Sequence, residues 1–295
     1  MSDAEPLAPG LYLVATPIGN LGDITLRALD VLQRANRIAC EDTRQTQKLL
    51  NHFGITTPTI SYHEHNERTR AAELLEEIKS GAAVAVVSDA GTPGISDPGA
   101  VLVNEAIAAG VPVIPIPGAN AAVSALIASG LPNAEFTFFG FLPEKSGARR
   151  SRLEEIAAEA GEAARTLIFY EAPHRIVDTL ADMESIWGAT LHAVAARELT
   201  KLHEELLRGT VAEIREELKS RDRVRGEFVL LIELPRANAP TQENAGKTSI
   251  GERIARMQAE AGIDEKEALK RLARELGQSK SETYRELQRE RARRR

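Results

Sequence analysis

Cysteine and aromatic residues are scarce in this chain of 295 residues, and long hydrophobic runs are absent. The single cysteine, Cys40, excludes an internal disulfide and a thiolate metal cluster, so a reducing compartment is expected. No stretch approaches the roughly 18 consecutive apolar residues of a membrane span, and the polar, acidic N-terminal segment is unlike a signal peptide. We therefore expect a cytoplasmic protein that is not bound to a membrane.

The familiar phosphate-binding motifs are missing from the loop that dominates the sequence. Residues 88–99, Ser-Asp-Ala-Gly-Thr-Pro-Gly-Ile-Ser-Asp-Pro-Gly, follow an apolar run at 82–87 and precede a helical pattern. The loop has neither the lysine of a P-loop nor the glycine spacing of a dinucleotide fingerprint. It carries Asp89 and Asp97 instead, so we expect it to face a neutral or cationic ligand rather than a polyphosphate.

The glycines and prolines of this loop predict a rigid surface at the end of a strand. Glycine allows positive φ or close approach to a ligand, whereas Pro93 and Pro98 fix φ and stiffen the segment. Ligands of parallel α/β sheets bind beyond the carboxyl ends of the strands, which makes the loop a candidate binding site. The alternative is a purely structural turn, in which Asp97 caps the helix that follows Pro98.

Short apolar runs alternate with helical patterns, which is typical of α/β domains with a parallel sheet. The first set of predicted strands is 11–15, 37–40, 59–62, 82–87 and 111–116, and the second is 136–141, 166–170, 191–196 and 227–234. A small-residue helix at 121–130 leads from one set to the other. The sequence thus predicts two α/β domains, at 11–120 and 121–234, followed by a polar linker at 235–248.

The remaining segment, 249–295, differs from the rest in charge. The chain carries a net charge of −6, but residues 241–295 hold 14 Lys/Arg and 10 Asp/Glu, a net +4 that leaves −10 on the first 240 residues. Asp264 with Glu267, and Ser279 with Glu282, have the spacing of capping boxes. We predict a basic, helix-turn-helix-like module here, with a solvated charged appendage as the alternative.

Six segments of the chain, taken in order, form a set that is more specific than any one of them. They are Ala-Thr-Pro-Ile-Gly-Asn-Leu-Gly-Asp at 15–23, Cys-Glu-Asp-Thr-Arg at 40–44, the loop 88–99, Pro-Gly-Ala-Asn-Ala at 117–121, Phe-Tyr-Glu-Ala-Pro-His-Arg at 169–175 and Gly-Glu-Phe-Val at 226–229. Together they resemble the tetrapyrrole methylase fold of the class III S-adenosylmethionine-dependent methyltransferases. Within that superfamily they are most similar to the enzymes that 2′-O-methylate a decoding-centre cytidine of 16S ribosomal RNA. The similarity spans residues 11 to about 234, and the basic tail resembles that family's C-terminal module.

The resemblance implies a homodimer, with S-adenosylmethionine in a cleft between the two α/β domains and 16S ribosomal RNA, in the small ribosomal subunit, as substrate. Acidic surroundings agree with this cofactor, since they suit a sulfonium and an ammonium better than a phosphate. The resemblance places the cofactor beside Pro17, Asp89, Gly91, Thr92, Pro93, Ile95, Asn120, Ala121 and Tyr170.

Methyl transfer to a ribose hydroxyl is an in-line displacement, so it depends mainly on positioning and on a group that accepts the hydroxyl proton. Glu171 and His174 follow a predicted strand, in a loop stiffened by Pro173. Arg197 and Glu198 are rival candidates in the cleft, and Arg197 is counted among the candidate catalytic residues. If Glu171 is the base, Glu171→Ala should abolish turnover and leave cofactor binding intact. The alternative is that Glu171 and His174 only form hydrogen bonds at a helix start.

Basic clusters in the second domain are candidates for phosphate contacts, although each could equally be a solvated face. The candidates are Lys145, Arg149, Arg150, Arg152, Arg175 and Arg223. His63, Glu64 and His65 do not make a complete ligand set, and we predict no metal.

Two other functions remain open at this point. A methyltransferase acting on a tetrapyrrole or another small molecule is disfavoured by the basic tail and by an aromatic content of only 4%, which provides few side chains to line a macrocycle pocket. A non-catalytic RNA-binding or ribosome-assembly protein of the same fold is disfavoured by the intact cofactor-loop motifs. Cofactor binding and the methylated product discriminate among the three.

Overall fold

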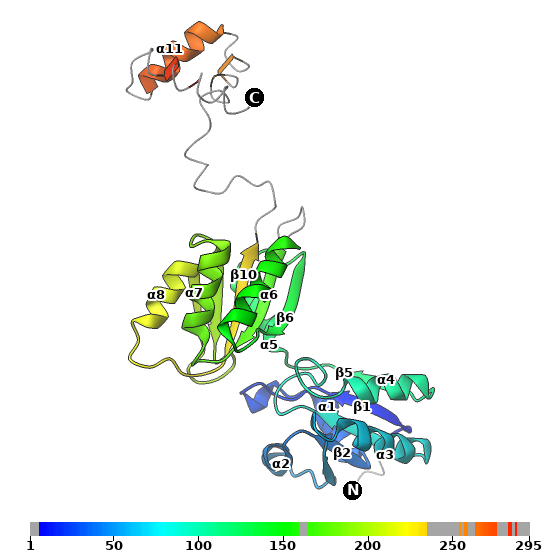
Figure 1. The fold of residues 1–295 in the computed structure, drawn as a ribbon. Helices are drawn as coiled ribbons and strands as arrows, with labels where there is room; N and C mark the ends of the chain where they lie inside the picture. Colours follow the sequence, from blue (N-terminus) through cyan, green and yellow to red (C-terminus); the bar gives the residue numbers. More distant parts are fainter. Residues whose placement is uncertain are drawn as a thin grey trace. The chain divides into compact units, whose positions relative to one another are not determined.

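The structure is a computed structural model that describes residues 6–159 and 165–234, and, in the C-terminal part, residues 254, 257–258, 263–275, 283–284 and 287. The chain separates into two compact units, Met1–Ala237 and Asn238–Arg295 (Figure 1). The predicted linker and the second predicted capping box lie outside the described residues. None of the helices in the described part has both the length and the apolar character that crossing a membrane requires.

The first sheet of the larger unit is parallel throughout, as predicted from the alternating pattern. Its strands are β1 (Gly10–Val14), β2 (Arg37–Cys40), β3 (Thr59–Ser61), β4 (Ala83–Val87) and β5 (Val113–Ile116), in the order β3-β2-β4-β1-β5. Between the strands run the 3-10 helix η1 (Leu21–Asp23) and the helices α1 (Leu26–Arg34), α2 (Thr43–His52), α3 (Glu67–Lys79) and α4 (Ala100–Ala108). The strand order places β4 and β1 at the centre of the sheet.

Strand β4 is buried along its whole length because helices cover both faces of the sheet. Ala85 and Val87 pack into a cluster with Leu32 of α1, whereas Val84 and Val86 pack on the other face with residues of α3 and α4. A strand buried on both faces appears in the sequence as a continuous apolar run rather than an alternating one. This is why the run at 82–87 is so prominent.

The second sheet is mixed. It contains β6 (Phe136–Phe141), β7 (Arg165–Glu171), β8 (His192–Arg197), β9 (Glu205–Thr210) and β10 (Phe228–Leu234), in the order β6-β7-β10-β8-β9. Only the β6–β7 pair is parallel within this described sheet, and the other pairs are antiparallel. Strand β9 was not predicted. It is a partly exposed edge strand, Glu-Leu-Leu-Arg-Gly-Thr, and lacks a clear apolar period.

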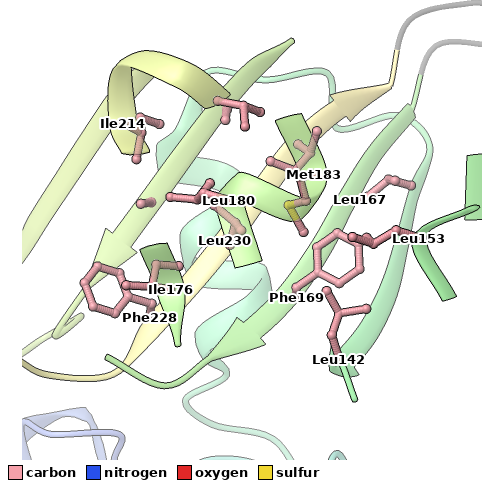
Figure 2. Packing of buried hydrophobic residues seen from close by; sticks show 14 of the residues in the cluster. Leu142, Leu153, Leu167, Phe169, Ile176, Leu180, Met183, Ile214, Phe228 and Leu230 are labelled. Carbon is pink, nitrogen blue, oxygen red and sulfur yellow. The ribbon is translucent and has the colours of Figure 1, made fainter. Parts of the chain in front are cut away.

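Alternating side chains of β10 face opposite layers of helices. Phe228 and Leu230 point into a core with Phe169 and Leu180, as Figure 2 shows. The helices on this face are α6 (Ser146–Ala158), α7 (Ile176–Trp187) and α8 (Val211–Lys219), which Figure 1 labels. On the other face, Val229 packs with residues of α5 (Ala121–Ser129). The predicted boundary at residue 120 falls immediately before α5, which packs against β10, β7 and β8.

The described part of the smaller unit contains the helix α11 (Glu265–Glu275). The backbone N–H of Glu267 donates to Asp264 Oδ1 at 2.8 Å, which is half of the capping box predicted for these two residues. Leu269 and Leu272 of this helix pack together with Ile254 and Leu287. The helix-turn-helix arrangement itself stays a prediction, since residues 276–278 lie outside the described part.

Candidate functional site

A cavity of about 460 Å³ lies where the strand ends of the two sheets meet. It is lined from the first sheet by the loops that follow β1, β2, β4 and β5, and from the second by the ends of β6, β7 and β8 and the start of β10. Its volume is within the range of about 300–1,000 Å³ that is usual for small-molecule and cofactor sites. Its place beyond the carboxyl ends of parallel strands is the one expected for a ligand site in an α/β fold.

The loop 88–99 is held against the loop that follows β1. Thr16 and Gly91 exchange two backbone hydrogen bonds, N–H to O distances of 2.8 and 3.0 Å, and the buried Ser88 hydroxyl donates to the carbonyls of Ala90 and Gly91 at 3.2 Å each. Gly91, Gly94 and Gly99 all have positive φ, at 82°, 80° and 148°. The positive φ values predicted for the glycines of this loop are therefore observed.

The same loop is tied to the segment after β5. The Thr92 hydroxyl donates to the Ala119 carbonyl at 3.1 Å, and the Asn120 amide donates to Thr92 Oγ1 at 3.4 Å. Asn120 also caps α5, since its Oδ1 accepts the Val123 N–H at 3.1 Å. One side chain thus joins the cavity loop to the start of a helix of the second sheet.

Three carboxylates give one side of the cavity a negative charge: Glu41, Asp89 and Asp97. Burial, and secondarily the nearby Glu41 and Asp89, raise the pKa of Asp97 to about 6. Burial, and then Asp89, also raise the pKa of Glu41. The charge of Asp89 thus disfavours ionisation of both Asp97 and Glu41, so a bound cation would be stabilised here.

Asp97 is not the cap of the helix that follows it. Helix α4 begins at Ala100 and has Gly99 at its N-cap position, without a side-chain capping bond in this described segment. The structural alternative considered for Asp97 was therefore wrong. The Asp97 side chain is instead part of the cavity lining.

The cavity lining also contains apolar and aromatic side chains. Ile18 and Ile95 come from the first sheet's loops, and Tyr170 and Phe141 from the ends of two strands of the second. Tyr170 packs edge to face on Phe141, with ring centroids 5.6 Å apart, and burial raises its pKa. Such side chains suit a planar, uncharged group such as a nucleobase.

Most of the residues predicted for the cofactor lie around this cavity. Asp89, Gly91, Thr92, Ile95, Asn120, Ala121 and Tyr170 line it, whereas Pro17 and Pro93 do not. Their contact with a cofactor stays a prediction. The sequence reasoning named no role for Glu41, Lys201 and Glu227, which also line the cavity. Glu41 and Glu227 fall inside the resembling segments at 40–44 and 226–229, which was a usable signal, whereas no motif marked Lys201.

The structure does not favour Glu171 as a base. Its side chain is 1% exposed and accepts hydrogen bonds from Arg175 Nε at 2.8 Å, from the Thr179 hydroxyl at 2.6 Å and from its neighbour's N–H, Ala172, at 2.8 Å. A carboxylate with so many donors has little capacity left for a substrate proton. Glu171 fixes the start of α7, which is the alternative role considered for it.

The other two predicted catalytic residues are not in the cavity lining. His174 is exposed on the turn before α7. Arg197 Nε donates to Glu205 Oε2 at 2.9 Å, and its side chain supports the β8–β9 hairpin rather than the cavity. The cavity lining therefore contains Asp89 and Asp97 but neither His174 nor Arg197.

The predicted phosphate contacts divide into buried and exposed side chains. Arg149 is 4% exposed and forms an ion pair with Asp182 at 2.8 Å, and Arg175 is held by Glu171, so neither presents a surface to RNA. These two assignments are corrected. Arg152 lies over the Phe139 ring at 5.6 Å. Lys145, Arg150 and Arg223 are exposed, and their contact with RNA stays a prediction.

Comparison with known proteins adds a family to this geometry. The family model described as tetrapyrrole (corrin/porphyrin) methylases matches residues 10–215. A protein named ribosomal RNA small subunit methyltransferase I from Halalkalibacterium halodurans is 48% identical over 274 residues, covering 93% of each chain. The protein of the same name from Mesorhizobium japonicum is 43% identical over 284 residues, covering 96% of this chain and 93% of its own.

Solved structures share the fold at much lower identity. Diphthine synthase superposes with a TM-score of 0.56 at 18% identity, covering 76% of this chain and 89% of its own. Uroporphyrin-III C-methyltransferase from Thermus thermophilus, in complex with S-adenosyl homocysteine, gives a TM-score of 0.51 at 19% identity, covering 76% and 96%. The chain therefore belongs to the tetrapyrrole methylase family, and within it to the group of proteins named ribosomal RNA small subunit methyltransferase I.

Proposed function

We propose that the protein transfers a methyl group from S-adenosylmethionine to the 2′-hydroxyl of a cytidine in the decoding centre of 16S ribosomal RNA. The observation that carries the proposal is the acidic cavity at the strand ends, in a chain of this methyltransferase family. We further propose that it acts in the cytoplasm as a homodimer, with the small ribosomal subunit as its substrate. The names of its relatives support the ribosomal substrate.

The residues of the cavity fit S-adenosylmethionine, which supplies an electrophilic methyl group on a sulfonium when it is bound. Asp89, Asp97 and Glu41 would favour its two cationic groups, because their negative charge is concentrated in a partly buried space. Ile95 and Tyr170 would enclose its adenine. The absence of a cationic side chain from the loop 88–99 agrees with a ligand that carries no polyphosphate.

The work of the protein in such a transfer is mainly orientation. An in-line displacement needs the ribose oxygen aligned with the methyl group, and holding two reactants in that geometry can supply about 7–11 kcal/mol of the barrier. Hydrogen bonds at Thr16, Gly91 and Thr92 fix the cavity loop in advance. A loop that is already ordered does not have to be ordered at the moment of reaction.

The outer part of the cavity fits an RNA nucleotide better than a macrocycle. Phe141 is 57% exposed and lies beside Tyr170, so one face of an unstacked base could pack on it. Exposed cations of the second domain, Lys145, Arg150 and Arg223, are available for phosphates. These features support RNA as the substrate over a tetrapyrrole.

The test is transfer of labelled methyl from S-adenosylmethionine to purified small subunits that lack their modifications, followed by nuclease digestion. We expect 2′-O-methylcytidine as the labelled product, and free 16S RNA assayed in parallel shows whether the assembled subunit is required. Absence of label on either RNA, with cofactor binding intact, would shift the assignment to a small-molecule methyltransferase. Absence of cofactor binding would favour a non-catalytic RNA-binding protein.

A further inference from the structure

Lys201 is the only cationic side chain that lines the cavity, counted over the residues that the structure describes. It shares the lining with six carboxylic acids, which are Glu41, Asp89, Asp97, Glu171, Glu198 and Glu227. A cavity with this charge would repel the phosphates that flank a target ribose. Among the described lining residues, Lys201 is therefore the one whose side chain can attract a phosphate.

Lys201 forms ion pairs with two carboxylates from separate segments. Its Nζ donates to Glu198 Oε1 and to Glu227 Oε2, at 2.9 Å each. Glu198 Oε1 also accepts the Glu227 N–H at 3.0 Å, which ties the turn after β8 to the start of β10. The ammonium group is thus fixed at the junction of two cavity-lining segments.

The backbone around Lys201 is strained, and strain of this kind accumulates at functional sites. Glu198 and Thr200 both have positive φ, at 51° and 66°, although neither is glycine. Residues other than glycine rarely adopt this conformation, so surrounding contacts must hold it. Gly226, whose φ is 90°, leaves the space that the Glu198 side chain occupies, because a Cβ at this position would clash with that side chain.

The turn also contacts the first sheet's loops. The Asn20 N–H donates to Thr200 Oγ1 at 3.2 Å, and a Cβ on Gly19 would clash with the Lys201 side chain. The aliphatic part of Lys201 therefore packs over the backbone of the loop that follows β1. Lys201 thus contacts both the loop after β1 and, through Glu227, the start of β10.

The two carboxylate partners of Lys201 are not equivalent. The Glu198 side chain is 21% exposed, whereas that of Glu227 is 81% exposed. An ion pair to such an exposed carboxylate is weak, because solvent screens it, and another anion can replace the carboxylate. Glu198 is therefore the partner that positions Lys201, and Glu227 is the one that an incoming anion can replace.

We propose that Lys201 is a substrate-contacting residue: its ammonium group binds a phosphate next to the methylated ribose, and this phosphate displaces Glu227. The inference rests on the proposed RNA substrate. The alternative anion is the carboxylate of the cofactor, but the exposure of Glu227 places the exchangeable partner on the solvent side of the cavity. Asp89 and Asp97, which would favour the cationic groups of the cofactor, come from the loop after β4, whereas Lys201 follows β8.

The experiment measures methylation kinetics and RNA binding for the full chain and for Lys201→Gln, Lys201→Arg and Glu227→Gln. We expect Lys201→Gln to raise the KM for RNA roughly tenfold, as loss of a charge-assisted contact does, with affinity for S-adenosyl homocysteine unchanged. The slope of log Kd against log salt should fall in magnitude by about 0.7, the value for one phosphate on a single strand. Lys201→Arg should keep most of the affinity.

For Glu227→Gln we expect the KM for RNA to fall, the opposite of the change in Lys201→Gln. A purely structural ion pair would not produce this opposite change. Removing the competing carboxylate should lower the KM for RNA, because the phosphate no longer has to displace it. Lys79→Gln is the matched control: Lys79 is 45% exposed, pairs with Glu76 and lies at the end of α3 that leads into the start of β4. Its RNA affinity and salt slope should equal those of the unmodified protein.

The outcomes separate this inference from the proposed function. RNA methylation absent from the unmodified protein would overturn both. Methylation present, with unchanged KM and salt slope in Lys201→Gln, would overturn the Lys201 contact alone, as would a loss of S-adenosyl homocysteine affinity in that variant. If Lys201→Gln does not fold, Glu227→Gln decides: an unchanged or raised KM for RNA rejects the proposal.

Discussion

The Glu171 carboxylate and the Arg175 guanidinium form a buried ion pair at 2.8 Å, with side chains that are 1% and 13% exposed. Arg175 also donates to the Leu142 carbonyl at 2.9 Å, so the pair joins the end of β7, the start of α7 and the segment after β6. Both residues belong to a motif that pointed to catalysis in the sequence. The geometry gives the pair a structural role instead.

We therefore expect Glu171→Ala to reduce stability rather than to remove a base. Loss of one partner leaves a buried guanidinium without its counter-ion, and such changes typically cost about 3–5 kcal/mol in the free energy of unfolding. Urea denaturation would measure this loss, and methyl transfer assayed well below the lowered melting temperature should retain turnover. Asp30→Asn, which breaks the exposed Asp30–Arg34 pair, is the control and should change stability little. A normally stable Glu171→Ala protein without turnover would restore the base hypothesis.

Asp97 should make the stability of the ligand-free protein depend on pH. Burial raises its pKa from 3.8 to about 6 in the folded chain, so folding favours the protonated form. This contribution to stability is complete below about pH 4 and is lost as the pH rises through 6. Asp97→Asn stays neutral and should raise the melting temperature at pH 8, with little change at pH 4. An equal shift at both pH values would contradict this assignment.

The same residue should couple cofactor binding to pH. A bound cation favours ionised Asp97, so affinity for S-adenosylmethionine should rise between pH 5 and 7, with release of protons near pH 6. Isothermal titration in buffers of different ionisation enthalpy measures the released protons. In Asp97→Asn the affinity should be weaker at pH 7 and the proton release smaller. Proton release equal to that of the unmodified protein would assign it to another group.

Glu67 holds the far end of the cavity loop although it lies outside the cavity lining. Its Oε1 accepts the Gly99 N–H at 3.0 Å and the hydroxyl of the buried Tyr62 at 2.9 Å. Glu67→Ala leaves both donors without this acceptor, at a cost of about 1–3 kcal/mol each when buried. We expect lower thermal stability and weaker cofactor binding, because Gly99 ends the segment that carries Asp97.

Glu67→Gln is the rescue variant, since its amide oxygen can accept the same hydrogen bonds. Stability and cofactor affinity in Glu67→Gln should fall between those of Glu67→Ala and of the unmodified protein. Tyr62→Phe removes one donor and leaves the bond to Gly99, so it should lower stability with little effect on cofactor affinity. Equal cofactor affinity in all these proteins, measured by titration calorimetry, would show that Glu67 does not position the loop.

The strands could be predicted from the sequence where burial dictates composition. Strand β4 is apolar throughout because helices cover both its faces, and Arg37–Cys40 and Phe136–Phe141 were predicted with the bounds observed. Strand β9 could not be predicted, because an edge strand exposed on one side needs no continuous apolar run. Its pairing with β8 is a tertiary property that local composition does not encode.

The location of the cavity could be predicted from the sequence, but not all of the residues that line it. Glycines and prolines marked the loop 88–99, and the fold places such loops at strand ends. Charged residues gave no equivalent signal, since a sequence does not distinguish Arg149, buried against Asp182, from an arginine in solvent. Lys201 was not predicted because nothing in the sequence marks its turn. Glu198 and Thr200 have positive φ there, but neither is a glycine, the residue that would have indicated such a conformation.

Phe141 provides the sharpest test of whether the outer cavity receives a base. It is 57% exposed beside Tyr170, and exposure of a large aromatic side chain at a cavity is more readily explained by a stacking ligand than by folding. Stacking of a base on an aromatic ring is worth about 1–3 kcal/mol by alanine substitution, so Phe141→Ala should raise the KM for RNA roughly tenfold.

The matched control for Phe141 lies on the same strand. Phe136 is 47% exposed at the other end of β6, outside the cavity lining, and Phe136→Ala should leave the KM for RNA unchanged. Phe141→Tyr keeps the ring and should behave nearly as the unmodified protein. Because the proposed contact is to the base and not to the cofactor, affinity for S-adenosyl homocysteine should stay constant across these variants. A raised KM in Phe136→Ala, or a loss of cofactor affinity in Phe141→Ala, would mean that the substitution disturbs the second sheet and that base stacking at Phe141 has not been demonstrated.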